Sequence, residues 1–366
     1  MKGSNQDIFE FYFDGRKRGV RRVPPHDPKH AVFSSFFSKE KLFQGSSTAF
    51  ERGWLYGYFG AEVLQSFIGL AFDEHQNYLF HELRSGKKTW LFGEGSCKSR
   101  FYPREALVSD SERELRWRFN ALQSKVRFVV KRKKADLVFQ YDFSRIRRKI
   151  GNYRCVFTVF NQVLASWVLY PLKARMRLDI EGQPNSVRLP PELECINGKW
   201  LESPFAYTEM VHIALPLFSA GWNWNIFYCV PTLGKGNPKF VGLMKFFVEL
   251  QKTRIPINYQ VYVVDLMSGA FHLFGDATST ESHVRRKPHI SASTPDGHLR
   301  IQATALHAPK KRLIKGVTLL SPLKVRSADI DYAAFPNEAR VEFRGRHYAG
   351  RGTSEITGLK KLAYWW

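Results

Sequence analysis

Hydrophobic and polar positions alternate over short stretches along most of this chain. The run Lys125-Val126-Arg127-Phe128-Val129 directs polar side chains to one side and apolar side chains to the other, as a half-buried β-strand requires. No stretch combines a sustained helical period with capping residues at its ends. The pattern therefore predicts an all-β protein of short antiparallel strands.

Turn residues separate the predicted strands at short intervals. In the first half of the chain the predicted strands are 67–72, 78–83, 89–92, 115–119, 126–130, 137–143, 156–159, 166–169 and 175–180. In the second half they are 221–229, 241–247, 259–264, 271–274, 299–306 and 341–347. Many short strands joined by small turns are typical of a sandwich or an up-and-down barrel.

The chain also repeats a pattern at about half its length. Four pairs of segments recur in both halves: Leu83-Arg-Ser-Gly86 with Leu266-Met-Ser-Gly269, Leu91-Phe-Gly-Glu94 with Leu273-Phe-Gly-Asp276, Leu115-Arg116 with Leu299-Arg300, and Gly53-Trp-Leu-Tyr56 with Gly221-Trp-Asn-Trp224. Such recurrence predicts an internal duplication, with two β-rich units side by side. The alternative is that unrelated hairpins use the same Ser-Gly turns.

Prolines mark the predicted domain boundaries. We expect a basic N-terminal arm over residues 1–45, a first β domain over 46–183, a linker over 184–203 with Pro184, Pro190 and Pro191, and a second β domain over 204–366. The chain of 366 residues is long enough for two such domains with cores of their own.

Composition adds two features to this picture. Aromatic residues make up 15% of the chain, and their broad apolar faces suit a pocket for a hydrophobic ligand as well as a β core. The formal net charge is +23, which favours phosphate-bearing partners, either an anionic membrane surface or nucleic acid. Because the basic runs are short and scattered, solvated turns are the alternative. We do not expect nucleic-acid binding, since no aromatic-basic motif of the common modules is present.

Several other classes of function are excluded at this level. The chain has no phosphate-binding glycine loop, no His-Glu-x-x-His zinc motif and no Gly-x-Ser-x-Gly elbow. Its four cysteines are too far apart for a metal knuckle, so we predict no metal site and no cofactor. Residues 155–172 and 211–234 carry no Asp, Glu, Lys or Arg, but polar residues and Pro interrupt them, which favours buried strands over membrane helices. We expect a cytoplasmic protein, with peripheral membrane association left open.

Three segments resemble the tandem lipocalin-like proteins grouped with carotenoid 1,2-hydratase (hydroxyneurosporene synthase) and the lipocalin-type Diels–Alderases. They are Arg175-Met-Arg-Leu-Asp-Ile-Glu-Gly182, the Trp-x-Trp segment Gly221-Trp-Asn-Trp224, and Val341-Glu-Phe-Arg-Gly345 with Gly350-Arg-Gly-Thr-Ser-Glu355. The similarity is spread over roughly residues 50–366. It implies two tandem lipocalin-like antiparallel β-barrels, or half-open sandwiches, that arose by internal duplication.

The resemblance also implies a chemistry. Hydratases of this group act without a redox cofactor: an acidic residue protonates a double bond, aromatic rings stabilise the cation, and water or an internal group quenches it. Their active segment reads approximately Tyr-His-Asp-His-Asn-Trp and stands shortly before the Trp-x-Trp strand. The corresponding residues here are Tyr207, Glu209 in place of the Asp, and His212 for a His. The chain departs from the pattern because the following Asn-Trp is missing.

These residues support such a role on their own chemistry. An apolar lining favours the neutral form of a carboxyl such as Glu209, and a neighbouring His212 can set its protonation state. Tyr207, Trp222 and Trp224 can stabilise positive charge, and we add Tyr262 as a ligand-binding candidate. The alternatives are a solvated turn carboxylate at Glu209 and ordinary core packing for the others. A hairpin role is expected for Asp265, Glu82 and His81.

The sequence therefore predicts a protein that binds an elongated hydrophobic small molecule, such as an isoprenoid, polyketide or lipid. As an enzyme it would perform cofactor-free, acid-catalysed hydration, cyclisation or isomerisation, with Glu209 and His212 as catalytic residues. The alternative is a non-catalytic carrier that docks on anionic membranes through its basic rims.

Overall fold

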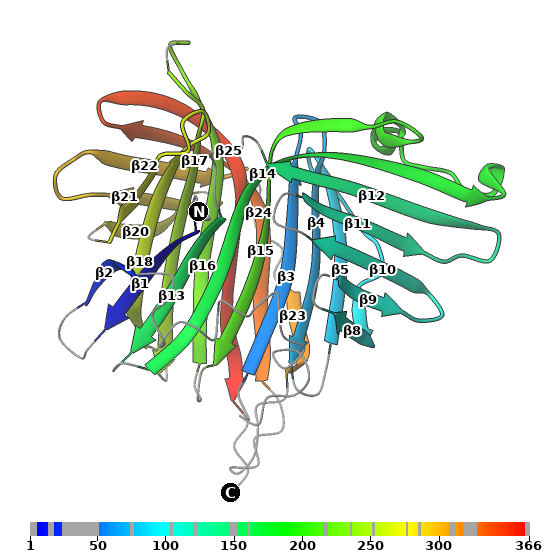
Figure 1. The fold of residues 1–366 in the computed structure, drawn as a ribbon, viewed down its shortest axis with the longest axis horizontal. Helices are drawn as coiled ribbons and strands as arrows, with labels where there is room; N and C mark the ends of the chain where they lie inside the picture. Colours follow the sequence, from blue (N-terminus) through cyan, green and yellow to red (C-terminus); the bar gives the residue numbers. More distant parts are fainter. Residues whose placement is uncertain are drawn as a thin grey trace, which may run out of the picture. The chain divides into compact units, whose positions relative to one another are not determined.

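The computed structural model of this chain describes residues 6–13, 18–23, 51–73, 77–102, 105–119, 123–145, 152–159, 162–214, 219–234, 236–250, 253–275, 277–284, 287–306, 312–317 and 328–362. They divide into two compact units, the first made mainly of residues 51–214 and the second mainly of residues 219–362. Each unit is built on one curled antiparallel sheet (Figure 1). Across the described residues, we find no helix with the length and apolar character needed to span a membrane.

The first sheet holds 15 strands within the described residues. Its main path runs, in hydrogen-bonded order, through β6 (Lys88–Leu91), β5 (Asn77–Ser85), β4 (Gln65–Asp73), β3 (Glu51–Gly60), β15 (Leu201–Ala214), β14 (Gln162–Gly182), β12 (Ala135–Arg145), β11 (Gln123–Val130), β10 (Arg113–Phe119), β9 (Glu105–Ser109) and β8 (Ser99–Tyr102). Four further strands pair beside this path: β1 (Gln6–Phe13), β2 (Arg18–Val23), β7 (Gly95–Cys97) and β13 (Asn152–Val159).

The second sheet holds 10 strands within the described residues. Its main path runs through β19 (Phe271–Phe274), β18 (Thr253–Asp265), β17 (Lys239–Leu250), β16 (Ser219–Pro231), β25 (Arg346–Leu362), β24 (Ala328–Phe343), β22 (Leu299–Ala305), β21 (Lys287–Ser293) and β20 (Thr278–Val284), and β23 (Arg312–Val317) pairs with β24. The all-β class that the alternation predicts is confirmed.

The strand order confirms the duplication. The path β6-β5-β4-β3-β15-β14-β12-β11-β10 of the first sheet has the same order as β19-β18-β17-β16-β25-β24-β22-β21-β20 of the second. Gly53 and Gly221 begin matching segments on β3 and β16, and the two Ser-Gly turns join matching hairpins. Leu115 on β10 and Leu299 on β22 do not match, because the counterpart of β10 is β20. Their similarity reflects the common alternation of strands.

The expected boundary between the domains differs from the observed one. Residues 204–214, expected to open the second domain, belong to β15, which pairs with β14 and β3 in the first sheet. The expected linker over 184–203 carries two 3-10 helices, η3 (Pro184–Ser186) and η4 (Pro191–Ile196). Leu193 and Ile196 of η4 are fully buried in the first core. The prolines therefore mark a cap on the first unit, and the chain needs β15 to join the two halves of its sheet. Of the expected N-terminal arm, β1 and β2 are described, and 24–45 lies outside the described residues.

Three predicted strands have different ends in the structure. The predicted strands 166–169 and 175–180 are parts of one long strand, β14. The predicted strand 341–347 is instead a hairpin, since β24 ends at Phe343 and β25 begins at Arg346. Arg344 and Gly345 form its turn with φ of 51° and 71°. Positive φ at both central residues suits the twist of a two-residue hairpin.

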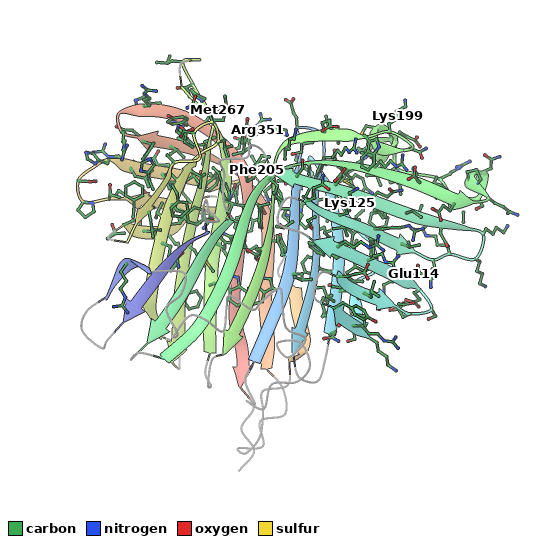
Figure 2. All side chains as sticks on the ribbon, in the orientation of Figure 1. Glu114, Lys125, Lys199, Phe205, Met267 and Arg351 are labelled. Carbon is green, nitrogen blue, oxygen red and sulfur yellow. The ribbon has the colours of Figure 1, made fainter. Side chains whose placement is uncertain are left out.

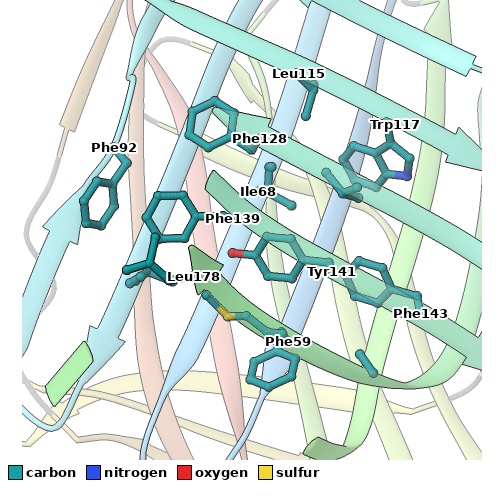
Figure 3. Close-up of a cluster of buried hydrophobic side chains, with 14 of the residues drawn as sticks. Phe59, Ile68, Phe92, Leu115, Trp117, Phe128, Phe139, Tyr141, Phe143 and Leu178 are labelled. Atoms are coloured by element: carbon teal, nitrogen blue, oxygen red, sulfur yellow. The ribbon is translucent and has the colours of Figure 1, made fainter. Parts of the chain in front are cut away.

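Each sheet carries its hydrophobic core on one face, which we call the inner face; the opposite face is the outer face. In the first unit the inner face is filled by large aromatic side chains, which Figure 3 shows stacked across the strands. The largest of them are Phe59, Trp117, Phe128, Phe139 and Phe143. The inner face of the second unit carries a separate cluster that includes Phe227, Val241, Val261, Ala303 and Val341.

One packing device occurs in both units. The ring of Phe80 lies over Gly69 on the neighbouring strand, and the ring of Tyr262 lies over Gly242 in the matching strands. A Cβ at Gly69 would approach Phe80 to 2.2 Å, and one at Gly242 would approach Tyr262 to 2.0 Å. Each glycine therefore leaves the space that the aromatic ring fills.

We predict that Gly242→Ala destabilises the second unit by about 1–3 kcal/mol, because the added methyl group must displace the Tyr262 ring. The unfolding midpoint in denaturant measures this loss. The double variant Gly242→Ala with Tyr262→Ala, which makes room for the methyl group, should lose less than the sum of the two single changes. Simple additivity would show that the ring and the glycine are not coupled.

Candidate functional site

The outer face of the first sheet has two parts of opposite character. Over β10–β12 it is charged and solvent-exposed, with Glu114 and Lys125 labelled in Figure 2 and ion pairs such as Lys131–Glu114 at 2.9 Å. Over β3, β4 and β15 it is aromatic and buried, with Tyr58, Phe67 and Tyr207 almost fully covered. The hydrophobic core of this sheet lies on the inner face. The buried aromatic surface on the outer face is separate from that core and is therefore a candidate site.

Glu209 lies in this aromatic part. It stands in the middle of β15, opposite Tyr56 of β3, and only 4% of it is exposed. The indole nitrogen Nε1 of Trp54 donates a hydrogen bond to Glu209 Oε1 at 2.7 Å. Glu209 is therefore a buried, hydrogen-bonded carboxyl group, and the alternative of a solvated turn carboxylate does not apply.

Tyr207 lies two residues before Glu209 and faces the same way along the strand. Its ring is fully buried, and its centroid lies 5.6 Å from those of both Tyr56 and Tyr58. Tyr56 stands opposite Glu209 on β3, and the rings of Tyr58 and Tyr207 extend the aromatic surface from there. Their π faces supply the negative potential that stabilises a developing cation.

His212 is placed only in part. It pairs in register with Ser166 of β14 and Gly53 of β3. It lies three residues after Glu209 along β15. The side chain of His212 lies outside what the structure describes.

Trp222 and Trp224 stand on β16, in the second sheet. Both point to its outer face, the face opposite Phe227 and Cys229 of the core. Trp224 is 6% exposed, and Trp222 is half-buried. The two tryptophans therefore share one surface, as their spacing predicts, and they do not belong to the core cluster of the second unit.

Tyr262 lies on the same outer face, two strands from β16. Its ring covers Gly242, stacks on Phe271 at 5.8 Å and meets the edge of Phe240 at 5.6 Å. Since Phe80 makes the matching contact in the first unit, this position has a structural role that both copies share.

The duplication reveals a residue that the sequence reasoning did not select. Tyr56 of β3 stands opposite Glu209, and Trp224, its counterpart on β16, stands opposite Glu355 of β25. Glu355 is 7% exposed. Each unit thus carries a buried glutamate opposite an aromatic residue at a matching position. Only the strand pairing shows this match, because each glutamate strand is distant in the chain from its partner: β15 pairs with β3, and β25 pairs with β16.

A cluster of polar side chains that the sequence reasoning did not identify lies on the inner face of the first unit. The hydroxyl of Tyr141 lies 2.5 Å from His81 Nε2 and 2.6 Å from Ser66 Oγ. The rings of Phe92, Phe128 and Phe139 surround His81, which is fully buried. Burial lowers the pKa of His81 to about 3, so the imidazole is neutral at physiological pH.

Glu82 and Asp265, expected in hairpins, make structural contacts. Glu82 forms a buried ion pair with Arg84. Asp265 ends β18 and accepts hydrogen bonds from the backbone nitrogens of Met267 and Ser268 in the following turn. Lys239 also bonds this carboxylate, and these hydrogen bonds hold the pKa of Asp265 well below its usual range. Within the described residues, no three His, Cys, Asp or Glu side chains are grouped to hold a metal ion.

Comparison with known proteins gives only distant structural matches. No family model matches the chain, and no curated protein matches it. Among solved structures, an AttH candidate from Nitrosomonas europaea is 13% identical, with a TM-score of 0.45 over 92% of this chain and 99% of that chain. Kievitone hydratase from Nectria haematococca is 8% identical, with a TM-score of 0.43 over 88% of this chain and 94% of that chain.

A third solved structure, CghA, is 7% identical, with a TM-score of 0.39 over 86% of this chain and 89% of that chain. Identities and TM-scores this low carry no argument about function.

Proposed function

We propose that this protein binds a hydrophobic small molecule and protonates one of its double bonds, with Glu209 as the proton donor. The reaction is a cofactor-free hydration, cyclisation or isomerisation. The observation that carries the proposal is the buried carboxyl of Glu209, held by Trp54, with Tyr56 opposite it on β3 and the ring of Tyr207 beside that of Tyr56. Proton transfer to carbon needs a carboxyl that is neutral before the step, and burial favours that form.

The neighbouring side chains have distinct parts in this proposal. Trp54 orients the carboxyl of Glu209 through its hydrogen bond to Oε1. Protonation creates a carbocation, and the tyrosine rings offer their π faces to it. After the step the Glu209 carboxylate is stabilised by the same indole donor, and it can accept a proton when water or an internal nucleophile quenches the cation.

On the outer face of the second sheet, Trp222, Trp224 and Tyr262 are proposed as contacts for a hydrophobic molecule, independently of the Glu209 site. Their burial fits apolar contact, although the ring of Tyr262 also fills the space above Gly242. His212 stays a candidate for positioning through its place on β15. The net charge of +23 supports docking on an anionic membrane face as a second proposal.

Native mass spectrometry of the protein, gently purified from its host, tests the binding step. We expect one apolar molecule retained per chain and recovered by organic extraction. A protein that retains this molecule and returns it unchanged on prolonged incubation is a carrier, which contradicts the catalytic part of the proposal. A protein that retains nucleic acid in place of an apolar molecule contradicts the binding part as well.

A further inference from the structure

The inner faces of the two units are filled by different kinds of side chain, although their strands match. On β12 the inward residues are Leu137, Phe139, Tyr141 and Phe143; on its counterpart β22 they are Leu299, Ile301, Ala303 and Ala305. On β10 they include Leu115 and Trp117; on its counterpart β20 they include Ser279 and Glu281. Large aromatic groups in the first unit are thus replaced by small and polar ones in the second.

The two units also close their sheets by different contacts. In the first, Trp117 of β10 reaches across the inner face to β3, where a Cβ at Gly57 would lie 3.2 Å from its Cη2 atom. In the second, Glu281 of β20 reaches the matching strand β16, where Asn223 Nδ2 donates to Glu281 Oε1 at 2.5 Å. Four strands separate β20 from β16 along the sheet, so this contact crosses the inner face of the curled sheet. The contact across the inner face is therefore apolar in the first unit and a hydrogen bond between Asn223 and Glu281 in the second.

More polar groups adjoin this hydrogen bond. Lys245 of β17 lies opposite Asn223 and places its Nζ 3.4 Å from Glu281 Oε1. Two residues along β16, Asn225 accepts a hydrogen bond from Ser354 of β25, and Asn337 of β24 donates to the same serine hydroxyl. We call these six residues the amide cluster: Asn223, Asn225, Lys245, Glu281, Asn337 and Ser354. The counterparts of Asn223 and Asn225 on β3 are Leu55 and Gly57, which carry no polar side chain.

The amide cluster contains hydrogen-bond acceptors that no group in the described part of the chain satisfies. The side-chain oxygens of Asn223 and Asn337 are buried without a hydrogen-bond partner, and both residues are only 2% exposed. Buried amide oxygens in proteins are rarely left without a donor. Lys245 and Glu281 balance each other's charge. The side-chain oxygens of Asn223 and Asn337 therefore call for hydrogen-bond donors, and the Lys245–Glu281 pair does not call for an added charge.

We propose that the inner face of the second unit is a binding site for a neutral molecule that carries hydroxyl groups on an apolar skeleton. The hydroxyls donate to the side-chain oxygens of Asn223 and Asn337, and the skeleton lies against Ala292, Ala303 and Ala305. This site uses no residue of the Glu209 site and stands whether or not Glu209 is a proton donor.

The proposal is tested by calorimetric titration of the full-length protein with 1,2-decanediol, compared with 1,2-dimethoxydecane, which has no donor. We expect the wild type to bind the diol at least tenfold more tightly than the dimethoxy compound. Asn223→Leu, which copies Leu55, and Ala303→Phe, which introduces an aromatic of the kind found on β12, should each weaken diol binding at least tenfold. Gln302→Ala, on the exposed outer face of the same strand β22, is the matched control and should bind as the wild type does.

Equal binding of the two compounds by the wild type would overturn the proposal, and this comparison needs no variant to fold. Unchanged diol binding in both Asn223→Leu and Ala303→Phe would overturn it too. Circular dichroism checks that the variants keep their β structure. Glu209→Gln should bind the diol as the wild type does, so failure of this site and failure of the proposed catalytic function are separate results.

Discussion

Replacing Glu209 by Gln is expected to lower the rate of conversion of the retained molecule by about 10²–10⁴-fold, the range typical for loss of a general acid. Gln has nearly the same size, and its amide oxygen can still accept the hydrogen bond from Trp54 Nε1. It has no acidic proton to give. We therefore expect binding of the molecule to change little while turnover is lost. Product formation followed over time measures the rate, and native mass spectrometry measures the occupancy.

Two other glutamates provide the controls. Glu202 lies on the same strand but is exposed, so Glu202→Gln should convert the molecule at the wild-type rate. Glu355 occupies the matching position of the second unit and is buried as Glu209 is. If Glu355→Gln removed turnover and Glu209→Gln did not, the assignment of the proton donor would be wrong.

Acidification is expected to destabilise the first unit through His81. Burial lowers the pKa of His81 to about 3, whereas the side chain titrates near about 6.5 in an unfolded chain. Between these values the unfolded state binds a proton that the folded state does not, so the free energy of unfolding falls as the pH falls. This group contributes its full stability above about pH 6.5, and the loss at pH 5 is roughly 2 kcal/mol.

His81→Phe isolates this contribution. Phe cannot titrate, and Tyr141 keeps its hydrogen bond with Ser66 at 2.6 Å. The variant should therefore lose less stability than the wild type between pH 7 and pH 5, as measured by unfolding midpoints in denaturant. His347→Gln, at the exposed hairpin end of β25, should leave the pH dependence unchanged. An equal pH dependence in the wild type and His81→Phe would show that His81 is not the group responsible.

Local patterns in the sequence predicted most of the fold, because a half-buried strand shows itself by alternation alone. The duplication was visible where turns and the Trp-containing strands repeat. The domain boundary was not predicted, because Pro190 and Pro191 suit a linker and a 3-10 cap equally well. That β15 belongs to the first sheet follows from pairing between distant segments, which no local pattern records.

The candidate site shows the same limit. Tyr207 and Glu209 were selected from the sequence, and the structure places both, buried, on β15; their roles in binding and catalysis stay predictions. Their partner Trp54 was recognised only as part of the repeat, because it is 155 residues away from Glu209 in the chain. The tryptophans of β16, close to Glu209 in sequence, belong to the other unit. Glu355 and the amide cluster became visible only when the matching strands of the two units were compared.

Conversion of the retained molecule in D₂O tests the central claim most directly, namely proton transfer from the protein to a carbon atom of the ligand. Hydration, cyclisation or isomerisation that begins with protonation places solvent-derived hydrogen on carbon, since a carboxyl proton exchanges with the solvent. We predict that the wild type forms product with deuterium bound to carbon and that Glu209→Gln forms almost none. Product that carries no deuterium on carbon would contradict the account.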